Sequence, residues 1–585
     1  MVTNNLHGWT GKCLTVDLSK KVFKKTSLER EILLQYMGGR GLGVRLLWEL
    51  VDPKTDPYTP ENLLVLATGP LTATQIPTTG RISIIGKSPL TNGVFYSSCG
   101  GFFGVSLKQA GFDVLVIRGK SERPVYLYVD NDFVEIRDVS HLWGKTTKDT
   151  LKILEKDLGK DFEVVCIGPA GENLVRYACI ACGPNNFAGR GGLGAVMGSK
   201  NLKAIAVRGT YKPKIAKEKS LNNLLEKCRI RIRWNPILDK ALSYYGTSAL
   251  VNLINEHRIL PTKNFQQGWF EHAEKISGET LKETIFVEKR SCYNCPIACK
   301  RKTKVNDVMG EGPEFETIGS LGSMLLIDDI KTVAEINYLC NEFGLDTIST
   351  GGTIACAMEL SEKGLLEEKI NWGDVEKVKE LVIKTVYKKG LGKLLAEGSR
   401  FLAKKYGCEE VSMQVKGLEL PMYDPRGVLG QALAYATSNR GGCHLNAYMI
   451  GVEILGYPYL MDRFSPVNKP SIVVYMQNLA AAIDSMVLCK FLGFEFDEET
   501  FANFLSYVTG ENFSQESVIS IGERIWNLER LFNFKAGLNG KTDNLPKRFQ
   551  IPLQKMLEEY YLVRKWTVDG FPTPDKLKSL GLPVK

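Results

Sequence analysis

The sequence predicts an α+β protein in which a β-rich N-terminal region precedes two mostly helical regions. Two observations predict this order. Up to about residue 210, short runs rich in β-branched residues alternate with Gly, Pro, Asp and Asn. From about Lys212 onward, apolar residues recur at the spacing of amphipathic helices. We therefore expect domains at residues 1–210, 211–415 and 416–585.

Short β-branched runs mark the expected strands of the first region. These are Val22–Phe23, Leu63–Leu66, Arg81–Ile85, Val114–Arg118, Val125–Val129, Val134–Arg137 and Ala204–Val207. Asp130, Asn131 and Asp132 lie between two of these runs, and such residues favour a tight turn. We expect a hairpin there.

Helical periodicity marks the later regions. The expected helices cover Glu335–Phe343, Glu376–Lys389, Leu391–Lys405 and Ile472–Leu488. Asp374 precedes one of them and resembles an N-cap. Gly364, Gly390 and Gly407 fall where helices should stop, because glycine tolerates the left-handed conformation of a C-cap.

Composition indicates an ordinary soluble protein, since 44% of its 585 residues are hydrophobic and 24% are charged. The N-terminus lacks the basic and apolar regions of a secretory signal. Apolar runs such as Leu63–Leu71 are shorter than the roughly 20 residues of a membrane span. The longer run Ile472–Leu488 is interrupted by Gln477, Asn478 and Asp484. We expect a cytoplasmic protein without membrane association.

The net charge of +10 would suit an acidic partner, either a nucleic acid or a small acidic electron carrier. The lysines are spread along the chain apart from short groups such as Lys20–Lys25. A solvated basic surface explains the charge equally well. We therefore predict no nucleic-acid partner.

Three of the fourteen cysteines form a metal-binding pattern. Without a secretory signal, the cysteines argue against a disulfide framework. Cys292, Cys295 and Cys299 are spaced so that one loop can supply three thiolates to a [4Fe–4S] cluster, which then needs a fourth ligand from elsewhere. Zinc is the alternative, but it usually requires a second close pair of Cys or His, and none of the five histidines neighbours this loop.

Cys179 and Cys182 form a second, weaker CxxC pair. Two small buried thiols explain it as well as a redox pair does.

Glycine and arginine recur together in the N-terminal region. Gly189–Gly194 matches the GxGxxG pattern of dinucleotide sites, but the flanking residues do not form a clear βαβ unit. Thr79–Arg81 and Ser98–Gly101 have the same character. Because glycines let backbone amides approach an anion and arginine suits phosphate, these segments indicate a large phosphate-bearing cofactor.

Together these residues resemble the tungsten-containing aldehyde:ferredoxin oxidoreductases along nearly the whole chain. The segments that carry the resemblance are Thr79–Arg81, Gly168–Val175, Ala188–Gly192, the CxxCPxxC loop from Cys292 to Cys299, Glu311–Glu316, Tyr423–Gly427 and Asn439–His444. The resemblance implies an N-terminal domain of two β-sheets that forms the base for a bis-pterin cofactor, covered by two helical domains. It also implies one tungsten held by two pyranopterins, and a magnesium ion that bridges their phosphates at the carbonyls of Ser98 and Ala188.

The family has two copies of a pterin-binding motif, which match Asn341–Asp346 and Asp484–Cys489. The second copy implies that Cys489 is the fourth cluster ligand. Both copies depart from the family pattern. Asn341 replaces an aspartate, and Val487 replaces a glycine, where φ > 0 would be disfavoured. We expect weaker or rearranged contacts to one pterin.

The resemblance assigns further residues. The expected cofactor contacts are Arg81, Ser98, Gly100, Phe187, Ala188, Gly189, Arg190, Asn341, Leu345, Asp346, Asn439, Arg440, Asp484, Leu488 and Lys490. Some relatives bridge two subunits with a metal held by an ExxH motif, which corresponds here to Glu335–Tyr338. Tyrosine is a poor replacement for a histidine ligand, so we expect no such metal; a homodimer or additional electron-transfer subunits stay open.

The implied reaction converts an aldehyde and water to a carboxylic acid, two protons and two electrons. Glu316 is the expected general base or acid, His444 could hydrogen-bond the carbonyl oxygen, and Tyr423 is a third candidate. The electrons would leave through the cluster to ferredoxin or another acidic carrier.

Two alternatives remain at this point. One is a relative with the same cofactor and another substrate, such as the catalytic subunit of an aryl-CoA reductase complex. The other is a cluster-bearing electron-transfer or nucleic-acid-binding protein without tungsten.

Overall fold

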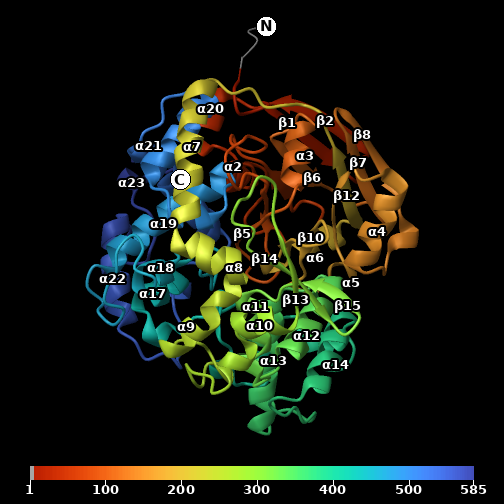
Figure 1. Cartoon of the computed structure of the whole chain (residues 1–585), viewed down its shortest axis with the longest axis vertical. Coiled ribbons are helices and arrows are strands. Elements are labelled where there is room, and N and C mark those ends of the chain that lie inside the picture. The colour runs from red at the N-terminus through yellow and green to blue at the C-terminus, as the bar shows by residue number, and fades with distance from the viewer. Residues whose placement is uncertain (1–5, 585) are drawn as a thin grey trace.

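The computed structural model describes residues 6–584 and confirms the predicted α+β order (Figure 1). Two β-sheets built from the N-terminal part occupy the upper right of the view. The first helical part lies below them, and the second, drawn in blue, lies to their left. No helix within residues 6–584 is both long and apolar enough to span a lipid bilayer.

The first sheet has six strands in the order β2-β1-β6-β3-β4-β5. They are β1 (Lys12–Asp17), β2 (Val22–Ser27), β3 (Leu64–Ala67), β4 (Ile82–Lys87), β5 (Val94–Cys99) and β6 (Val114–Arg118). Only β1 and β6 run parallel, and β3 and β4 are buried on both faces. The predicted limits of Val114–Arg118 are confirmed.

The second sheet has the order β11-β10-β9-β12-β7-β8. Its strands are β7 (Val125–Asp130), β8 (Phe133–Asp138), β9 (Glu163–Cys166), β10 (Ile180–Cys182), β11 (Phe187–Ala188) and β12 (Leu202–Arg208). β7 and β8 pair antiparallel on either side of Asn131, which has φ of 52°, so the predicted hairpin is confirmed.

Helices cover the sheets and build the rest of the chain. The N-terminal helices are α1 (Arg30–Tyr36), α2 (Gly39–Leu50), α3 (Phe103–Gln109), α4 (Thr147–Leu158), α5 (Pro169–Glu172) and α6 (Leu193–Ser199). The next are α7 (Glu218–Trp234), α8 (Ser243–Tyr245), α9 (Leu250–Glu256), α10 (Gly278–Thr284), α11 (Phe315–Leu321), α12 (Ile330–Phe343), α13 (Thr347–Glu362), α14 (Val375–Val386), α15 (Gly392–Leu395) and α16 (Ser399–Lys405). The last are α17 (Leu429–Thr437), α18 (Met449–Glu453), α19 (Lys469–Met486), α20 (Glu498–Thr509), α21 (Gln515–Lys535), α22 (Leu553–Arg564) and α23 (Pro574–Ser579).

Two small sheets interrupt the helices. One is β13 (Phe286–Arg290), β14 (Lys300–Val305) and β15 (Val308–Glu311), and the other is β16 (Gln414–Val415) and β17 (Leu418–Glu419). The loop between β13 and β14 carries the predicted cluster cysteines.

Three of the four predicted helices are present as α12, α14 and α19, with limits that differ from the predicted ones by up to five residues. Asp374 caps α14, since its carboxylate accepts from the Lys377 N–H. The fourth predicted helix needs a correction. The continuous helix expected over Leu391–Lys405 is wrong, because the structure has two short helices, α15 and α16. They are separated at Gly398, whose φ of 88° is not helical.

Glycines bring α19 against the backbone of the N-terminal part. An ideal Cβ at Gly38 would lie 2.5 Å from the Thr68 carbonyl oxygen, and one at Gly39 would lie 2.5 Å from Val487 Cγ2. A Cβ at Gly69 would overlap the Met486 carbonyl. The start of α2 and the end of β3 therefore approach the end of α19 at distances that only glycine allows.

We predict that Gly69→Ala lowers the stability of the protein. The added methyl group has no space between two backbones, so the cost should be about 2 kcal/mol or more. Thermal unfolding followed by circular dichroism should show a Tm lower by several degrees.

Gly493→Ala is the matched control, because a Cβ there meets no atom within 4 Å. Equal Tm values for the two variants would contradict the close contact at Gly69.

Candidate active site and cofactor cavity

Four cysteines from two distant segments line one internal cavity of about 410 Å³. Cys292, Cys295 and Cys299 lie on the loop between β13 and β14, and Cys489 follows the end of α19. All four cysteines lie in the wall of this one cavity, which suits a group whose several metal atoms each take one thiolate.

The loop between β3 and β4 positions both cysteine segments. The side-chain amide of Asn294 donates to the carbonyls of Gln75 (2.7 Å) and Ile76 (3.0 Å). The Thr78 N–H donates to the Asn294 carbonyl at 3.0 Å, and the Thr78 hydroxyl accepts from the Cys489 N–H at 3.3 Å. A single residue therefore fixes the spacing between segments that are almost 200 positions apart.

Burial keeps three of these thiols, those of Cys295, Cys299 and Cys489, protonated when they hold no metal. It raises the pKa of Cys295 to about 12, and it raises the pKa of Cys299 and of Cys489 as well. The other cysteines nearby act in the same direction for Cys295 and Cys299. Because metals bind thiolates, a bound cation would release protons here.

Many of the residues predicted to bind the cofactor line the same cavity. They are Arg81, Ser98, Gly100, Phe187, Gly189, Asn341, Leu345 and Asp346. Ala188 lies beside them in β11 and is fully buried. The Ser98 carbonyl, assigned to magnesium by the family resemblance, accepts from Arg81 Nη2 at 3.0 Å.

Arg190 does not line this cavity but ties it to the helical parts. Its guanidinium lies 3.4 Å from the Asp346 carboxylate and donates to the Gly442 carbonyl at 2.8 Å and to the Glu419 carbonyl. The glycine-rich segment is thus held to the first motif by this arginine.

On α12, the residues that differ from the family motifs make side-chain contacts with neighbouring residues. The Asn341 amide lies 3.4 Å from Asn337 Oδ1. In the segment matched to the bridging-metal motif, Glu335 pairs with Lys379 at 2.8 Å, and the Tyr338 hydroxyl lies 2.6 Å from the Thr303 hydroxyl. The side chains of Glu335 and Tyr338 therefore both have partners within the protein.

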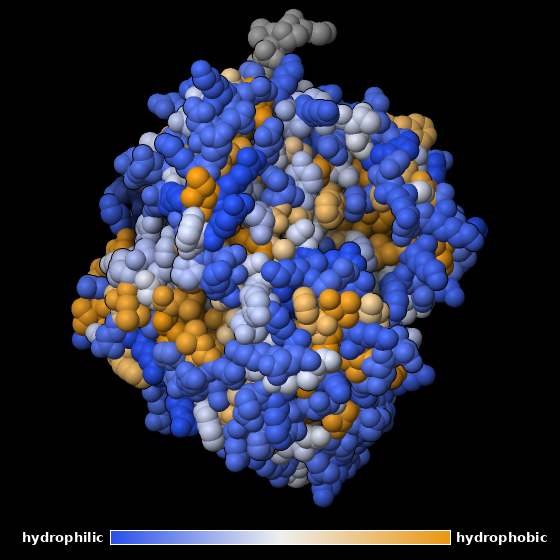
Figure 2. Space-filling view, in the orientation of Figure 1, coloured by the Kyte–Doolittle hydropathy of each residue, from blue (hydrophilic) through white to orange (hydrophobic). Residues whose placement is uncertain are grey.

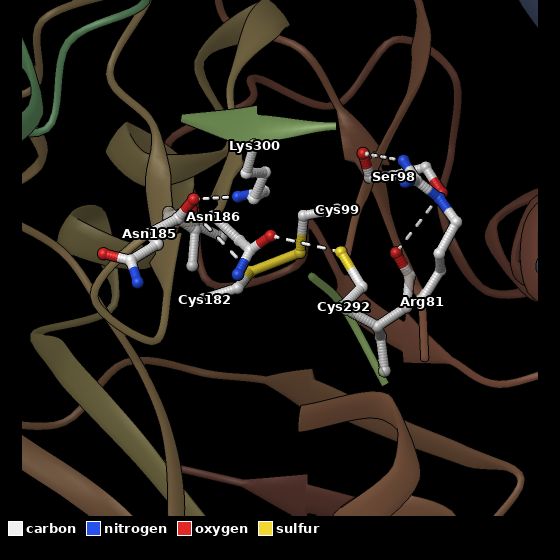
Figure 3. Close-up of a disulfide and its surroundings, with 10 residues drawn as sticks. Arg81, Ser98, Cys99, Cys182, Asn185, Asn186, Cys292 and Lys300 are labelled. Atoms are coloured by element: carbon white, nitrogen blue, oxygen red, sulfur yellow. Dashed lines mark hydrogen bonds between the residues drawn. A yellow bond between two sulfur atoms is a disulfide. The ribbon is translucent and has the colours of Figure 1, made fainter. Parts of the chain in front are cut away.

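A disulfide between Cys99 and Cys182 joins β5 to β10 at the edge of this cavity (Figure 3). Of the two interpretations of the CxxC pair, a redox pair of Cys179 with Cys182 is therefore wrong, because Cys182 pairs with Cys99. Cys179 is a free buried thiol, as the other interpretation has it. The end strands β5 and β11 of the two sheets contact each other, and linear CxxC spacing cannot reveal such a contact. Asn186 lies between the disulfide and the cluster loop, with its Oδ1 3.8 Å from Cys292 Sγ.

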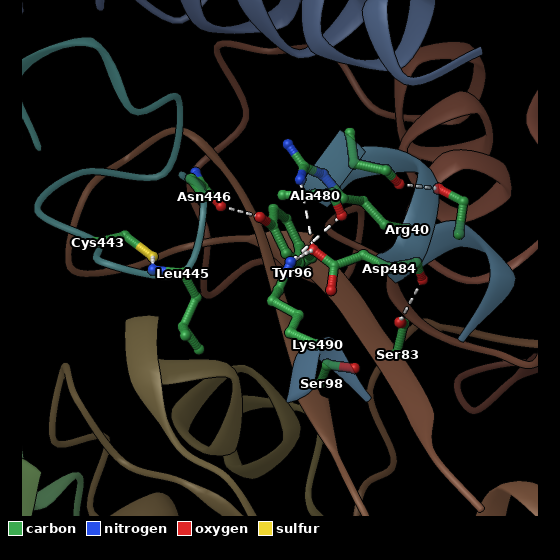
Figure 4. A network of polar contacts seen from close by, with 12 residues as sticks. Arg40, Ser83, Tyr96, Ser98, Cys443, Leu445, Asn446, Ala480, Asp484 and Lys490 are labelled. Atoms are coloured by element: carbon green, nitrogen blue, oxygen red, sulfur yellow. Dashed lines mark hydrogen bonds and ion pairs between the residues drawn. The ribbon is translucent and has the colours of Figure 1, made fainter. Parts of the chain in front are cut away.

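Asp484, which begins the second motif, lies in a buried charge network (Figure 4). Its carboxylate lies 2.7 Å from the Lys490 ammonium and 3.4 Å from the Arg40 guanidinium. Arg40 makes a two-pronged ion pair with Glu529, with both distances at 2.7 Å. Burial lowers the pKa of Lys490, and Asp484 opposes this effect.

Asn439 and Arg440 join the same network. The Asn439 amide donates to Glu529 at 3.1 Å. The Arg440 guanidinium lies 4.7 Å from the Tyr96 ring centre and donates to the Tyr96 carbonyl at 2.7 Å. Tyr96 and Arg40 were missed by the sequence reasoning, because neither stands in a recognisable motif.

The helices that lead into the two pterin motifs, α12 and α19, end in the same backbone conformation. Gly344 follows α12 and Val487 follows α19, and both are left-handed C-caps, with φ of 76° and 63°. Val487 thus keeps the conformation that was expected to be disfavoured. Its buried side chain fills the space left by Gly39 and Gly69, and the adjacent Leu488 packs in the apolar core.

A second cavity, of about 380 Å³, holds all three predicted catalytic side chains. Glu316 extends from α11, and its Oε1 lies 3.5 Å from His444 Nε2. The Tyr423 ring centre lies 5.7 Å from that of His444. The residues that line both cavities are Thr247, Glu314, Leu445 and Phe491. The two cavities therefore adjoin.

Burial sets the protonation of the catalytic pair. It raises the pKa of Glu316 to about 8, against a hydrogen bond from the Met422 N–H at 2.9 Å. It lowers the pKa of His444 well below its usual value, and three nearby cations add to this effect. At neutral pH the carboxyl is mostly protonated and the imidazole neutral. Within the described chain, Glu316 Oε1 and His444 Nδ1 have no hydrogen-bond partner.

Tyr448 is a further residue of this cavity that the sequence reasoning missed. Its hydroxyl lies 3.0 Å from the Tyr423 hydroxyl, and burial raises the pKa of both phenols. Linear spacing gave no signal for it, because residues 441–448 form a loop and not a helix.

Family models match most of the chain. One described as the N-terminal domain of aldehyde ferredoxin oxidoreductase matches residues 13–209, and one described as domains 2 and 3 of the same enzyme matches residues 223–582.

Full-length relatives and a solved structure agree with these models. The chain is 46% identical to a tungsten-containing aldehyde ferredoxin oxidoreductase of Thermococcus kodakarensis and 44% identical to that of Pyrococcus furiosus, with 99% of each chain covered. The active-site complex BamBC of benzoyl coenzyme A reductase, solved with 1,5-dienoyl-CoA, matches with a TM-score of 0.87 and 27% identity, over 99% of this chain and 97% of that one.

We predict a pH-dependent effect of Glu316→Gln on stability. Between pH 4.5 and about 8 the folded protein keeps a proton that the unfolded chain loses, so wild-type stability falls as the pH rises through this window. Glutamine cannot ionise. The Tm difference between variant and wild type should therefore move in favour of the variant from pH 5 to pH 8.5.

Glu155→Gln, at an exposed position on α4, should show no such trend. Parallel Tm profiles for Glu316→Gln and wild type would mean that the carboxyl is already ionised at low pH.

Proposed function

This chain belongs to the aldehyde ferredoxin oxidoreductase family, and we propose that it oxidises aldehydes to carboxylic acids at a tungsten bis-pterin centre. The reaction is RCHO + H₂O → RCOOH + 2H⁺ + 2e⁻. The electrons would pass through a [4Fe–4S] cluster to ferredoxin or another acidic carrier. One observation carries this proposal most strongly: the Glu316–His444 pair lies in a cavity that adjoins the cavity lined by four cysteines.

The residues present fit the cofactor. The first pterin would be held by Asn341–Asp346 with Arg81, and the second by Asp484–Lys490 with Asn439 and Arg440. Asn439 Oδ1 is buried without a hydrogen-bond donor in the described chain, which suits an amino group of a ligand. When bound, this group takes up the two electrons of the oxidation.

Magnesium would bind at the carbonyls of Ser98 and Ala188, as in the family pattern. The four cysteines would hold the cluster, since each iron of a cubane needs one thiolate.

Glu316 and His444 would handle the protons. The Glu316 carboxylate, formed above a pKa of about 8, can take a proton from the attacking water. The neutral imidazole of His444 can donate to the carbonyl oxygen of the aldehyde as charge builds there. Because Glu316 Oε1 lies 3.5 Å from His444 Nε2, a small movement of either side chain would let a proton pass between them.

Tyr423 and Tyr448 would orient the substrate. Their paired hydroxyls are polar groups in a wall that also contains Phe494 and Leu479. An apolar cavity with few polar groups excludes water and binds the organic part of a substrate.

A second candidate is the reduction of an aryl-CoA by the same cofactor, because the BamBC structure shares this fold. The identities of 46% and 44% to the two aldehyde enzymes named above, against 27% to that complex, favour aldehyde oxidation. A panel of aldehydes tested beside benzoyl-CoA and a dienoyl-CoA separates the two. A homodimer or added electron-transfer subunits would be compatible with either activity.

We predict four iron atoms and one tungsten per chain in anaerobically purified protein. Cys489→Ser should lose most of the iron, because one corner of the cluster then lacks its thiolate, whereas Cys408→Ser should keep it. Elemental analysis measures both. Iron without tungsten or molybdenum, from cells supplied with both metals, would favour a cluster-only electron-transfer protein, and zinc in place of iron would favour a zinc site.

We also predict that Glu316→Gln retains tungsten and iron but loses aldehyde-dependent viologen reduction by about 100-fold or more, as expected for a general acid–base residue. Wild-type kcat/KM should rise with pH through about 8 as the carboxyl ionises. Glu155→Gln serves as the control. Turnover unaffected by Glu316→Gln would exclude this residue from the reaction.

A further inference from the structure

The cysteine loop also lines a hollow of about 480 Å³, whose other lining residues include the exposed Ser291 and Pro296. Cys292 and Cys295 line both this hollow and the four-cysteine cavity. The opposite wall is the C-terminal end of α7, where Arg229 and Arg233 line the hollow. We call this surface the α7 hollow. It is a place where the predicted cluster ligands reach the outside of the protein.

The sequence of α7 explains why it presents arginines here. Leu221, Leu225 and Cys228 point inward and are buried at helical spacing. The residues that alternate with them near the end of the helix are exposed, including Ile230 (59%) and Trp234 (81%). α7 lies on the near side of the view in Figure 1, and Figure 2 shows hydrophilic and hydrophobic residues side by side in this region.

The charges of the hollow are unbalanced. Neither Arg229 nor Arg233 forms an ion pair with a carboxylate of the described chain, whereas Arg231 between them pairs with Glu495 at 2.7 Å. Asp239, an acidic group in the lining, already contacts Lys240 at 2.9 Å. Two guanidinium groups thus remain available to an anionic partner.

Two arginines line this hollow, and the exposed Trp234 follows Arg233 at the end of α7 without lining the hollow itself. Exposed arginine and tryptophan side chains on one helix end are typical of a protein-binding surface. Arg and Trp are enriched among residues that dominate binding energy, and opposite charge steers a partner into place. The apolar residues favour a protein over a small ion, and the positive charge requires that protein to be acidic.

From these observations we infer that the α7 hollow is the docking surface for the electron acceptor, a small acidic iron–sulfur protein. This inference rests on the proposed function in one respect, that electrons leave through the cysteine-held cluster. Each aldehyde releases two electrons, and a one-electron carrier takes one at each docking, so two reduced carriers form per turnover.

The test compares Arg229→Glu/Arg233→Glu with the wild-type holoenzyme. The probe is a purified small acidic bacterial ferredoxin, and its Kd is measured by titration calorimetry at low and at moderate salt. Lys152→Glu/Lys156→Glu is the matched control, because both lysines are exposed on α4, on the other side of the view in Figure 1. It makes the same change in net charge.

We expect the arginine pair to weaken ferredoxin binding about tenfold or more and to flatten its salt dependence, because close charge pairs govern both. The KM for ferredoxin should rise in parallel. Aldehyde-dependent reduction of benzyl viologen, which needs no protein docking, should stay within about twofold. Trp234→Ala should weaken binding without changing the salt dependence.

An unchanged Kd, equal weakening by the lysine pair, or an equal loss of viologen reduction would overturn the inference. So would tighter binding of a DNA duplex than of ferredoxin at the same site. Because calorimetry needs no turnover, absence of aldehyde oxidation in the wild type would refute the proposed function while the binding data still decide the docking surface.

Discussion

The backbone contact between the N-terminal part and the end of α19 constrains the rest of the molecule. Because Gly38, Gly39 and Gly69 have no side chains, the two chain segments meet closely, and the Val487 side chain packs into the space left by Gly39 and Gly69. This contact sets where α19 ends, and so where Asp484 and Cys489 lie. The cofactor cavity forms between the sheets and the helical parts only if that end is fixed. The catalytic cavity adjoins it, so its position depends on the same contact.

Buried charge follows from this arrangement. Arg40 begins the helix that touches the end of α19, and it brings a guanidinium to Asp484 and Glu529 inside the protein. Buried charges are tolerated when they are paired and hydrogen-bonded, and each of these groups has a partner. Replacing one member would leave another uncompensated. The network therefore links cofactor binding to the integrity of the fold.

Local features of the fold could be predicted from the sequence, and long-range ones could not. The strand Val114–Arg118, the turn at Asn131 and the cap at Asp374 depend on neighbouring residues, and all three are confirmed. Cys489 was reached only through the family resemblance, because no local pattern joins it to Cys292. The disulfide of Cys99, the place of Tyr448 and the break in the helix expected over Leu391–Lys405 depend on tertiary contacts that linear spacing does not encode.

Cys292 and Cys295 are partly exposed, which would help electrons to leave the protein but also makes these cysteines accessible to oxidants. A surface where electrons leave the protein is also a surface that dioxygen can reach. Oxidation of cysteine follows its exposure, so the loop between β13 and β14 is where air would first damage the protein. A bound carrier would cover that loop, and the resting enzyme would then be more vulnerable to oxygen than the enzyme engaged with its partner.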